Sequence, residues 1–179
     1  TETFLDTPDK SGMGGVYRIH MDEMADEPVH IEPGGDDPHL LAAFQARDPD
    51  ADNPASADGM CFDSEGNLYT GLFGDGAFFR LTFDAEGSVE SKECLLRTDQ
   101  MPCVDGIFYH REDNSIYITD SAQNAVHVYD ISADELTTLW KNGDTDGSGA
   151  GRAERRPHEN CQPGQRRRPA RRIPTTPRP

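Results

Sequence analysis

The sequence is poor in several features, and each scarcity limits what the chain can be. It has only three lysines, Lys10, Lys92 and Lys141, against 33 acidic residues, and its formal net charge is −16. No apolar run approaches the roughly 18 residues of a membrane-spanning helix, and no segment has the pattern of a signal peptide. The four cysteines form no Cys-x-x-Cys pair, which argues against a structural zinc site and favours buried thiols. We therefore expect no membrane partner, while a cytoplasmic and a periplasmic location both stay open.

The charge is divided unequally along the chain. Residues 1–150 contain 31 acidic and eight basic residues, whereas residues 151–179 contain nine arginines and two glutamates. An acidic body repels phosphate groups, so we expect no nucleic acid partner for residues 1–150. Such a surface attracts cations instead.

Residues 151–179 are rich in Arg and Pro, and Ile173 is their only sizeable aliphatic residue. So little apolar area cannot build a core, which predicts a disordered basic tail. Two interpretations stay open. The tail binds nucleic acid or an acidic surface, or the reading frame has shifted or been truncated, because out-of-frame codons of a GC-rich gene give Arg and Pro with almost no Lys. The second is favoured, since the tail begins where another strand is expected.

A repeat of about 47 residues runs through the acidic body. The stretch "ADGMCFDSEGNLYTG" begins at Ala57, and "VDGIFYHREDNSIYIT" begins at Val104. Each has Asp-Gly, a short apolar stretch, an acidic turn and a second apolar stretch. The apolar stretches are β-branched and aromatic, and Gly, Asn and Asp separate them, which predicts short antiparallel strands joined by turns.

Repeats of 40–50 residues with about four short strands are typical of β-propeller blades. The sequence therefore predicts an all-β fold, a partial β-propeller of the six-bladed type. We expect blade repeats near residues 1–50, 51–98 and 99–148, the first of them incomplete. In that first copy, residues 15–19 and 40–44 align with the third and outermost strands of the later copies. A closed propeller needs at least four blades, so the chain is expected to be a fragment of the ring.

Asp58 and Asp105 occupy equivalent positions in the two clear repeats, each before a Gly at the start of the innermost strand. Innermost strands line the central channel of a propeller. Carboxylates that converge there from successive blades offer the hard oxygen ligands that Ca²⁺ and Mg²⁺ prefer, and the following Gly lets the backbone bend. The alternative is that Asp-Gly only opens a turn before each strand.

Residues 57–87, "ADGMCFDSEGNLYTGLFGDGAFFRLTFDAEG", resemble the gluconolactonase, senescence marker protein (regucalcin) and luciferin-regenerating enzyme family of six-bladed β-propellers. The resemblance implies that Asp58 is a metal ligand and the general base, and it suggests Asp105 as a second ligand. In that family the second ligand usually precedes the Asp-Gly-Met motif, whereas Asp105 follows it. The family's remaining ligands have no counterpart in this sequence, so we expect them outside this chain.

The resemblance thus implies a divalent-metal-dependent hydrolase whose substrate is a sugar lactone or similar ester. The implied cofactor is Ca²⁺, with Mg²⁺ or Zn²⁺ as alternatives. Two other functions stay open, a propeller hydrolase of phosphotriesters and a non-catalytic propeller that binds a partner. Calcium titration and a lactone panel separate the catalytic from the non-catalytic function.

Four further expectations concern the last repeat. Asn142, Asp144 and Asp146 imitate a calcium-binding loop, but its twelfth position is Ala153 instead of Glu, so a solvated turn is the default. Residues 136–141 are expected to form an outermost strand. His127 is expected to be a packed or solvent-facing strand residue, and Trp140 to pack in the core or between blades.

Overall fold

The computed structural model describes residues 13–24, 28–31, 37–47 and 56–142. Within these ranges the chain consists of antiparallel strands and a single 3-10 turn, η1 (Met21–Met24), so the predicted all-β class is confirmed. Over the same residues no helix is long and apolar enough to cross a membrane. The basic segment 151–179 and all of the calcium-loop imitation except Asn142 lie outside the described residues.

Two four-stranded antiparallel sheets follow the sequence repeat. Each sheet is a simple meander in which consecutive strands are hydrogen-bonded neighbours. The first contains β3 (Ser56–Phe62), β4 (Leu68–Phe73), β5 (Ala77–Phe83) and β6 (Val89–Arg97). The second contains β7 (Val104–His110), β8 (Ser115–Asp120), β9 (Ala125–Asp130) and β10 (Glu135–Lys141). Residues 136–141 therefore form part of an outermost strand, as expected.

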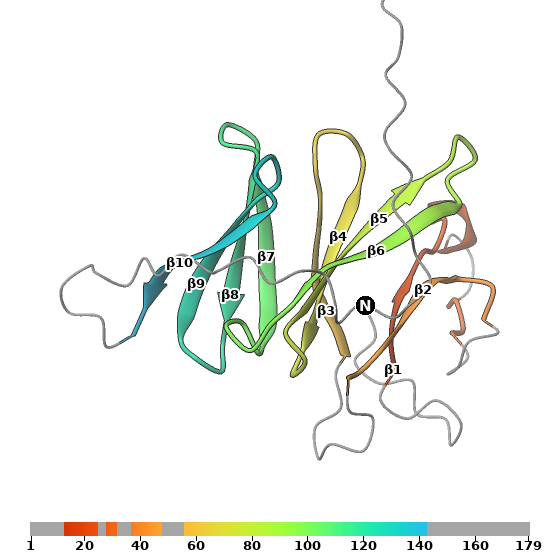
Figure 1. Ribbon diagram of the computed structural model, residues 1–179. Coiled ribbons are helices and arrows are strands. Elements are labelled where there is room, and N and C mark those ends of the chain that lie inside the picture. Colours follow the sequence, from red (N-terminus) through yellow and green to blue (C-terminus); the bar gives the residue numbers. More distant parts are fainter. Residues whose placement is uncertain (1–12, 25–27, 32–36, 48–55, 143–179) are drawn as a thin grey trace, which may run out of the picture.

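An N-terminal hairpin, β1 (Met13–Tyr17) with β2 (Leu40–Gln45), packs beside the first sheet (Figure 1). A Cβ on Gly14, near the start of β1, would overlap the backbone at Ser56. At the other end, Arg18 donates a hydrogen bond to the carbonyl of Gly87 in the β5–β6 turn. These contacts place the start of β1 beside the start of β3, and the residue after β1 beside the β5–β6 turn. The correspondence of this hairpin to the third and outermost strands of a blade stays a prediction.

The acidic turns of the repeat are held by aspartate side chains. Asp63 Oδ1 accepts hydrogen bonds from the backbone N–H groups of Glu65 and Asn67, both at 2.9 Å. Asp84 makes the same two contacts in the β5–β6 turn. The glycine that completes the first of these turns, Gly66, has φ of 87°, a conformation that other residues adopt at a cost. Turn chemistry therefore determines where the strands reverse.

Apolar side chains from neighbouring sheets form two cores, one on each side of the β3–β6 sheet. On one side Phe79 packs against Phe44 of the hairpin, with ring centroids 4.9 Å apart. On the other side Phe78 packs against Tyr129 of β9 at 5.4 Å. Phe78 is completely buried, and full burial of such a ring stabilises the fold by about 1.5–3 kcal/mol. Successive sheets stacked in chain order (Figure 1) form a partial β-propeller; the predicted limits of its repeats stay predictions.

Candidate metal site at paired beta-bulges

Each of the two predicted site residues lies in a β-bulge on the first strand of its sheet. In β3 the dipeptide Asp58-Gly59 stands opposite the single residue Gly71 of β4. In β7 the dipeptide Asp105-Gly106 stands opposite Thr119 of β8. A bulge places an extra residue in one strand and redirects the side chains around it. The repeated Asp-Gly is therefore a repeated bulge inside a strand, which is more specific than the turn opener considered from sequence.

Threonine hydroxyl groups on the neighbouring strands stabilise both bulges. Thr70 Oγ1 donates a hydrogen bond to the Gly59 carbonyl oxygen at 3.1 Å. Thr119 Oγ1 lies 3.1 Å from the Gly106 carbonyl oxygen and 2.8 Å from the Gly106 nitrogen. These contacts satisfy backbone groups that the irregular pairing would leave without a partner. The two threonines are not equivalent, because Thr70 pairs with Met60 beside its bulge whereas Thr119 stands opposite its bulge.

The first strands of the two sheets, β3 and β7, lie side by side (Figure 1). A Cβ on Gly59 would overlap the carbonyl oxygen of Asp105 and would lie 2.9 Å from the nitrogen of Ile107. Only glycine allows the two backbones to approach this closely. The fold thus brings together two aspartates that are 47 positions apart in the sequence.

The electrostatics of Asp58 agree with this placement. Burial raises the pKa of the Asp58 carboxyl group above its ordinary value, and the nearby negative charge of Asp105 raises it further. Asp58 and Asp105 are both half-buried residues. Burial and a like charge both destabilise the ionised form of a carboxyl group. A cation bound between them would relieve both effects.

The ligand set on this chain is small. Over the part of the chain that the structure describes, no three His, Cys, Asp or Glu side chains gather closely enough to hold a metal ion. Two carboxylates suit a hard divalent cation in charge and in donor type, but Ca²⁺ takes six to eight oxygen ligands. The pair could therefore supply part of a cation site, with the other ligands coming from carbonyl groups, water or other residues.

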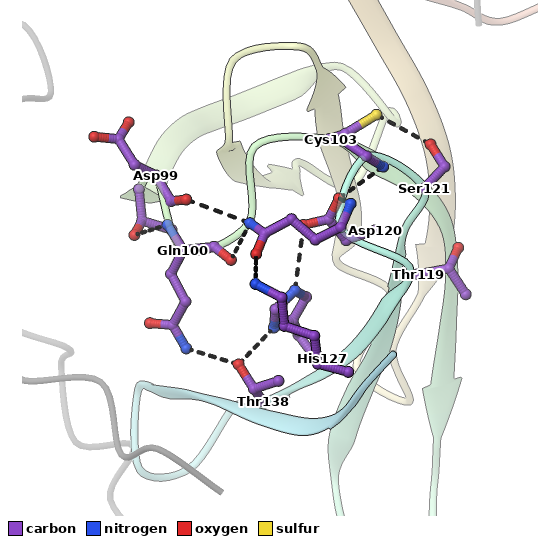
Figure 2. Close-up of polar contacts among 12 residues, drawn as sticks. Asp99, Gln100, Cys103, Thr119, Asp120, Ser121, His127 and Thr138 are labelled. Atoms are coloured by element: carbon purple, nitrogen blue, oxygen red, sulfur yellow. Dashed lines mark hydrogen bonds and ion pairs between the residues drawn. The ribbon is translucent and has the colours of Figure 1, made fainter. Parts of the chain in front are cut away.

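Sequence analysis did not identify a buried polar cluster between the two four-stranded sheets (Figure 2). His127 is 1% exposed, and its Nε2 lies 3.4 Å from Asp120 Oδ2 while its Nδ1 lies 3.1 Å from Thr138 Oγ1. Gln100, in the connection from β6 to β7, donates to the same Thr138 hydroxyl group at 3.2 Å. Burial lowers the pKa of His127, and the contact with Asp120 partly opposes this effect.

The cluster explains how the connection between the sheets is held. Gln123 Nε2 donates to the carbonyl oxygen of Gln100 at 2.9 Å, and Lys141 contacts the Gln123 side-chain oxygen. A sequence signal for this cluster exists, because in the repeat alignment His127 corresponds to Phe79 and Asp120 to Leu72. A polar pair that replaces an apolar pair at equivalent core positions indicates a specific buried contact.

Three other expectations have definite outcomes. His127 is a packed strand residue, in agreement with one of its two expected environments. Trp140 is 50% exposed, so it does not pack in the core of the described residues, and its packing between blades stays a prediction. Cys103 is buried, Cys61 and Cys94 are half-buried, and all three are free thiols. Cys161 lies outside the described residues.

Comparisons with known proteins assign no family to the chain. No family model matches the sequence, and no curated protein matches it. A solved structure with detectable similarity is the holo form of the pyranose dehydrogenase PQQ domain from Coprinopsis cinerea, at 24% identity and a TM-score of 0.38. The alignment covers 46% of this chain and 20% of that chain, so the similarity is limited to about a fifth of the neighbour's length.

Proposed function

We propose that this chain forms part of a divalent-cation-dependent hydrolase of sugar lactones or similar esters, with Asp58 and Asp105 as cation ligands. The observation that carries the proposal is the matched pair of β-bulges, which presents two carboxylates from adjacent first strands. The resemblance of residues 57–87 to the gluconolactonase family supports the substrate class. Ca²⁺ is the proposed cation, with Mg²⁺ and Zn²⁺ as alternatives.

The proposed roles follow from the chemistry of the two carboxylates. A divalent cation at this position would stabilise the negative charge that develops on the carbonyl oxygen of an ester. Asp58 accepts a proton from the attacking water, a role that needs a carboxylate within hydrogen-bonding distance of that water. Asp105 neutralises cation charge. The same arrangement suits phosphotriesters, in which water attacks phosphorus instead of the carbonyl carbon.

The experiment is a calorimetric titration of the chain with Ca²⁺, and then with Mg²⁺ and Zn²⁺. Because this chain supplies only two carboxylates, we expect dissociation constants of about 0.1–1 mM, the range of weak calcium sites. Asp58→Asn and Asp105→Asn should each weaken binding at least tenfold. Glu90→Gln is the matched control, because it removes one exposed charge from β6, outside the pair. If Glu90→Gln weakens Ca²⁺ binding as much as the aspartate variants do, the effect comes from the net negative charge of the chain, and the proposed site is refuted.

A lactone panel then separates catalysis from binding. Hydrolysis that depends on the cation and disappears in Asp58→Asn supports the proposed reaction. An unchanged rate in that variant removes Asp58 from the mechanism. Cation binding without hydrolysis of lactones or phosphotriesters favours the second candidate, a non-catalytic propeller module. The small ligand set among the described residues is the observation that favours this second candidate.

A further inference from the structure

The two bulges of the candidate metal site are supported unequally by the strands opposite them. The residue opposite Asp58-Gly59 is Gly71, which has no side chain to offer. A Cβ on Gly71 would overlap the side chain of Val104, so the packing of the sheets keeps this position a glycine. The residue opposite Asp105-Gly106 is Thr119. Of the two bulges, the one in β7 therefore has a polar side chain directly opposite it.

The Thr119 hydroxyl group makes two contacts with a single residue, Gly106. Its oxygen accepts a hydrogen bond from the Gly106 N–H group at 2.8 Å, and its O–H group donates to the Gly106 carbonyl oxygen at 3.1 Å. A Cβ on Gly106 would lie only 3.1 Å from Thr119 Oγ1, a separation tighter than an ordinary van der Waals contact. The absence of a side chain at Gly106 thus lets the hydroxyl group lie against the bulge.

One of these contacts holds a peptide unit that also faces the other sheet. The Gly106 nitrogen and the Asp105 carbonyl group belong to the same peptide unit, which is planar, and in a trans unit the N–H and C=O bonds point in opposite directions. The N–H group points to Thr119 on β8, while the carbonyl oxygen lies where a Cβ on Gly59 would be. The hydroxyl group therefore fixes the peptide unit that lies between Thr119 and the β3 bulge.

We infer that Thr119 is a positioning residue of the proposed cation site, in which it holds Asp105 in place beside Asp58. The inference rests on the proposed function, because cation affinity is the property that this position should change. Like charges repel, so without a cation the two carboxylates would move apart if the β7 bulge were free to shift. A fixed peptide unit opposes that movement and keeps the pair ready for a cation.

The substitution that removes only the hydroxyl group is Thr119→Val. Valine keeps the branched shape of threonine and suits a strand. Thr119 and Gly106 are both exposed, so water can replace the lost partner and the sheet should fold. Thr119→Ser keeps the hydroxyl group and is the rescue variant. Thr137→Val is the matched control, because in β10 of the same sheet it removes a hydroxyl group that donates to the Val128 carbonyl oxygen at 3.4 Å.

The first measurement is calorimetric titration with Ca²⁺. A hydrogen bond of ordinary strength corresponds to a factor of about three to ten in an equilibrium constant. Thr119→Val should therefore weaken Ca²⁺ binding by about that factor, while Thr119→Ser and Thr137→Val should bind Ca²⁺ as the parent chain does. Gly106→Ala, whose methyl group would press on the Thr119 hydroxyl group, repeats the test.

The second measurement is amide hydrogen exchange followed by NMR, and it needs no cation. In Thr119→Val the Gly106 amide should exchange at least about threefold faster, because its hydrogen-bond acceptor is lost. The amide resonance of Gly59 should shift as well, because Gly59 lies against the peptide unit that is released. Thr137→Val should change neither. Circular dichroism and a thermal melt establish that each variant folds.

The two measurements distinguish a failure of this inference from a failure of the proposed function. If the parent chain binds Ca²⁺ and Thr119→Val binds it equally well, the positioning role is overturned and the cation site remains. If the parent chain binds no Ca²⁺, the proposed function fails. Faster exchange at Gly106 with a shifted Gly59 resonance then supports the placement of Asp105 by Thr119, and unchanged spectra overturn it. Equal effects of Thr119→Val and Thr137→Val, or no rescue by serine, would also overturn the inference.

Discussion

The stacking of the two four-stranded sheets can be tested at Gly71, where β4 meets β7. A Cβ on Gly71 would overlap both the Cβ and a methyl carbon of Val104, and Val104 is itself completely buried. Gly71→Ala should therefore push the sheets apart. Overpacking of this kind costs about 1–3 kcal/mol, partly offset by about 0.5–1 kcal/mol from the lower backbone entropy of alanine in the unfolded chain. The expected loss of stability is about 1–2 kcal/mol.

The converse change, Val104→Ala, removes two buried methyl groups. At about 0.8 kcal/mol for each, with a further cost for the cavity, the loss should be about 2–3 kcal/mol. In Gly71→Ala/Val104→Ala the new methyl group occupies the space that the valine vacated, so the two losses should not add. We expect the double variant to be only about 2 kcal/mol less stable than the parent chain. The coupling energy is then about 2 kcal/mol, within the range for residues in contact.

The assay is urea unfolding followed by far-UV circular dichroism and by Trp140 fluorescence. Gly71→Ala/Val128→Ala is the matched control, because Val128 lies on the opposite face of its sheet and should show coupling near zero. If the losses of unfolding free energy in Gly71→Ala and Val104→Ala add to that of the double variant within about 0.5 kcal/mol, the two residues do not touch. The stacked arrangement would then be wrong, and with it the proximity of the two aspartates.

Two further predictions concern His127 and Gly59. Because burial lowers the pKa of His127 in the folded chain, its contribution to stability is present above the unfolded value of about 6.5 and is lost as pH falls below it. His127→Gln should therefore flatten the decline in stability between about pH 6.5 and 5, as chemical denaturation at each pH would show; parallel curves would contradict this. Gly59→Ala should separate β3 from β7 and lower the free energy of unfolding by about 1–3 kcal/mol, together with a loss of Ca²⁺ heat. A variant as stable as the parent would exclude the close approach at Asp105.

Much of the fold was predictable because its signals are local. Alternating apolar residues and Asp, Asn and Gly turns determine each meander, since strand period and turn conformation depend on residues a few positions apart. The acidic turns at Asp63 and Asp84 are examples in which one side chain caps its own turn. The equivalence of Asp58 and Asp105 was also visible, because a repeat gives equivalent positions equivalent structure.

The environment of individual side chains was not predictable in the same way. Trp140 and Phe78 are both apolar strand residues, yet one is half exposed and the other buried, because burial depends on whether another sheet covers that face. His127 and Asp120 meet only because β8 and β9 pair in one particular register. A short sequence stretch carries no information on such long-range contacts.

The all-β class, the repeat, the strand positions and the two matched aspartates were predictable from local periodicity and turn chemistry. The packing of the sheets shows in addition that Asp-Gly is a bulge, that β3 and β7 are neighbours and that the charge of Asp105 raises the pKa of the Asp58 carboxyl group. It also decided which sheet faces are covered. These features depend on the close packing of segments more than 30 residues apart, which glycine permits at Gly59 and Gly71 and which no local pattern specifies.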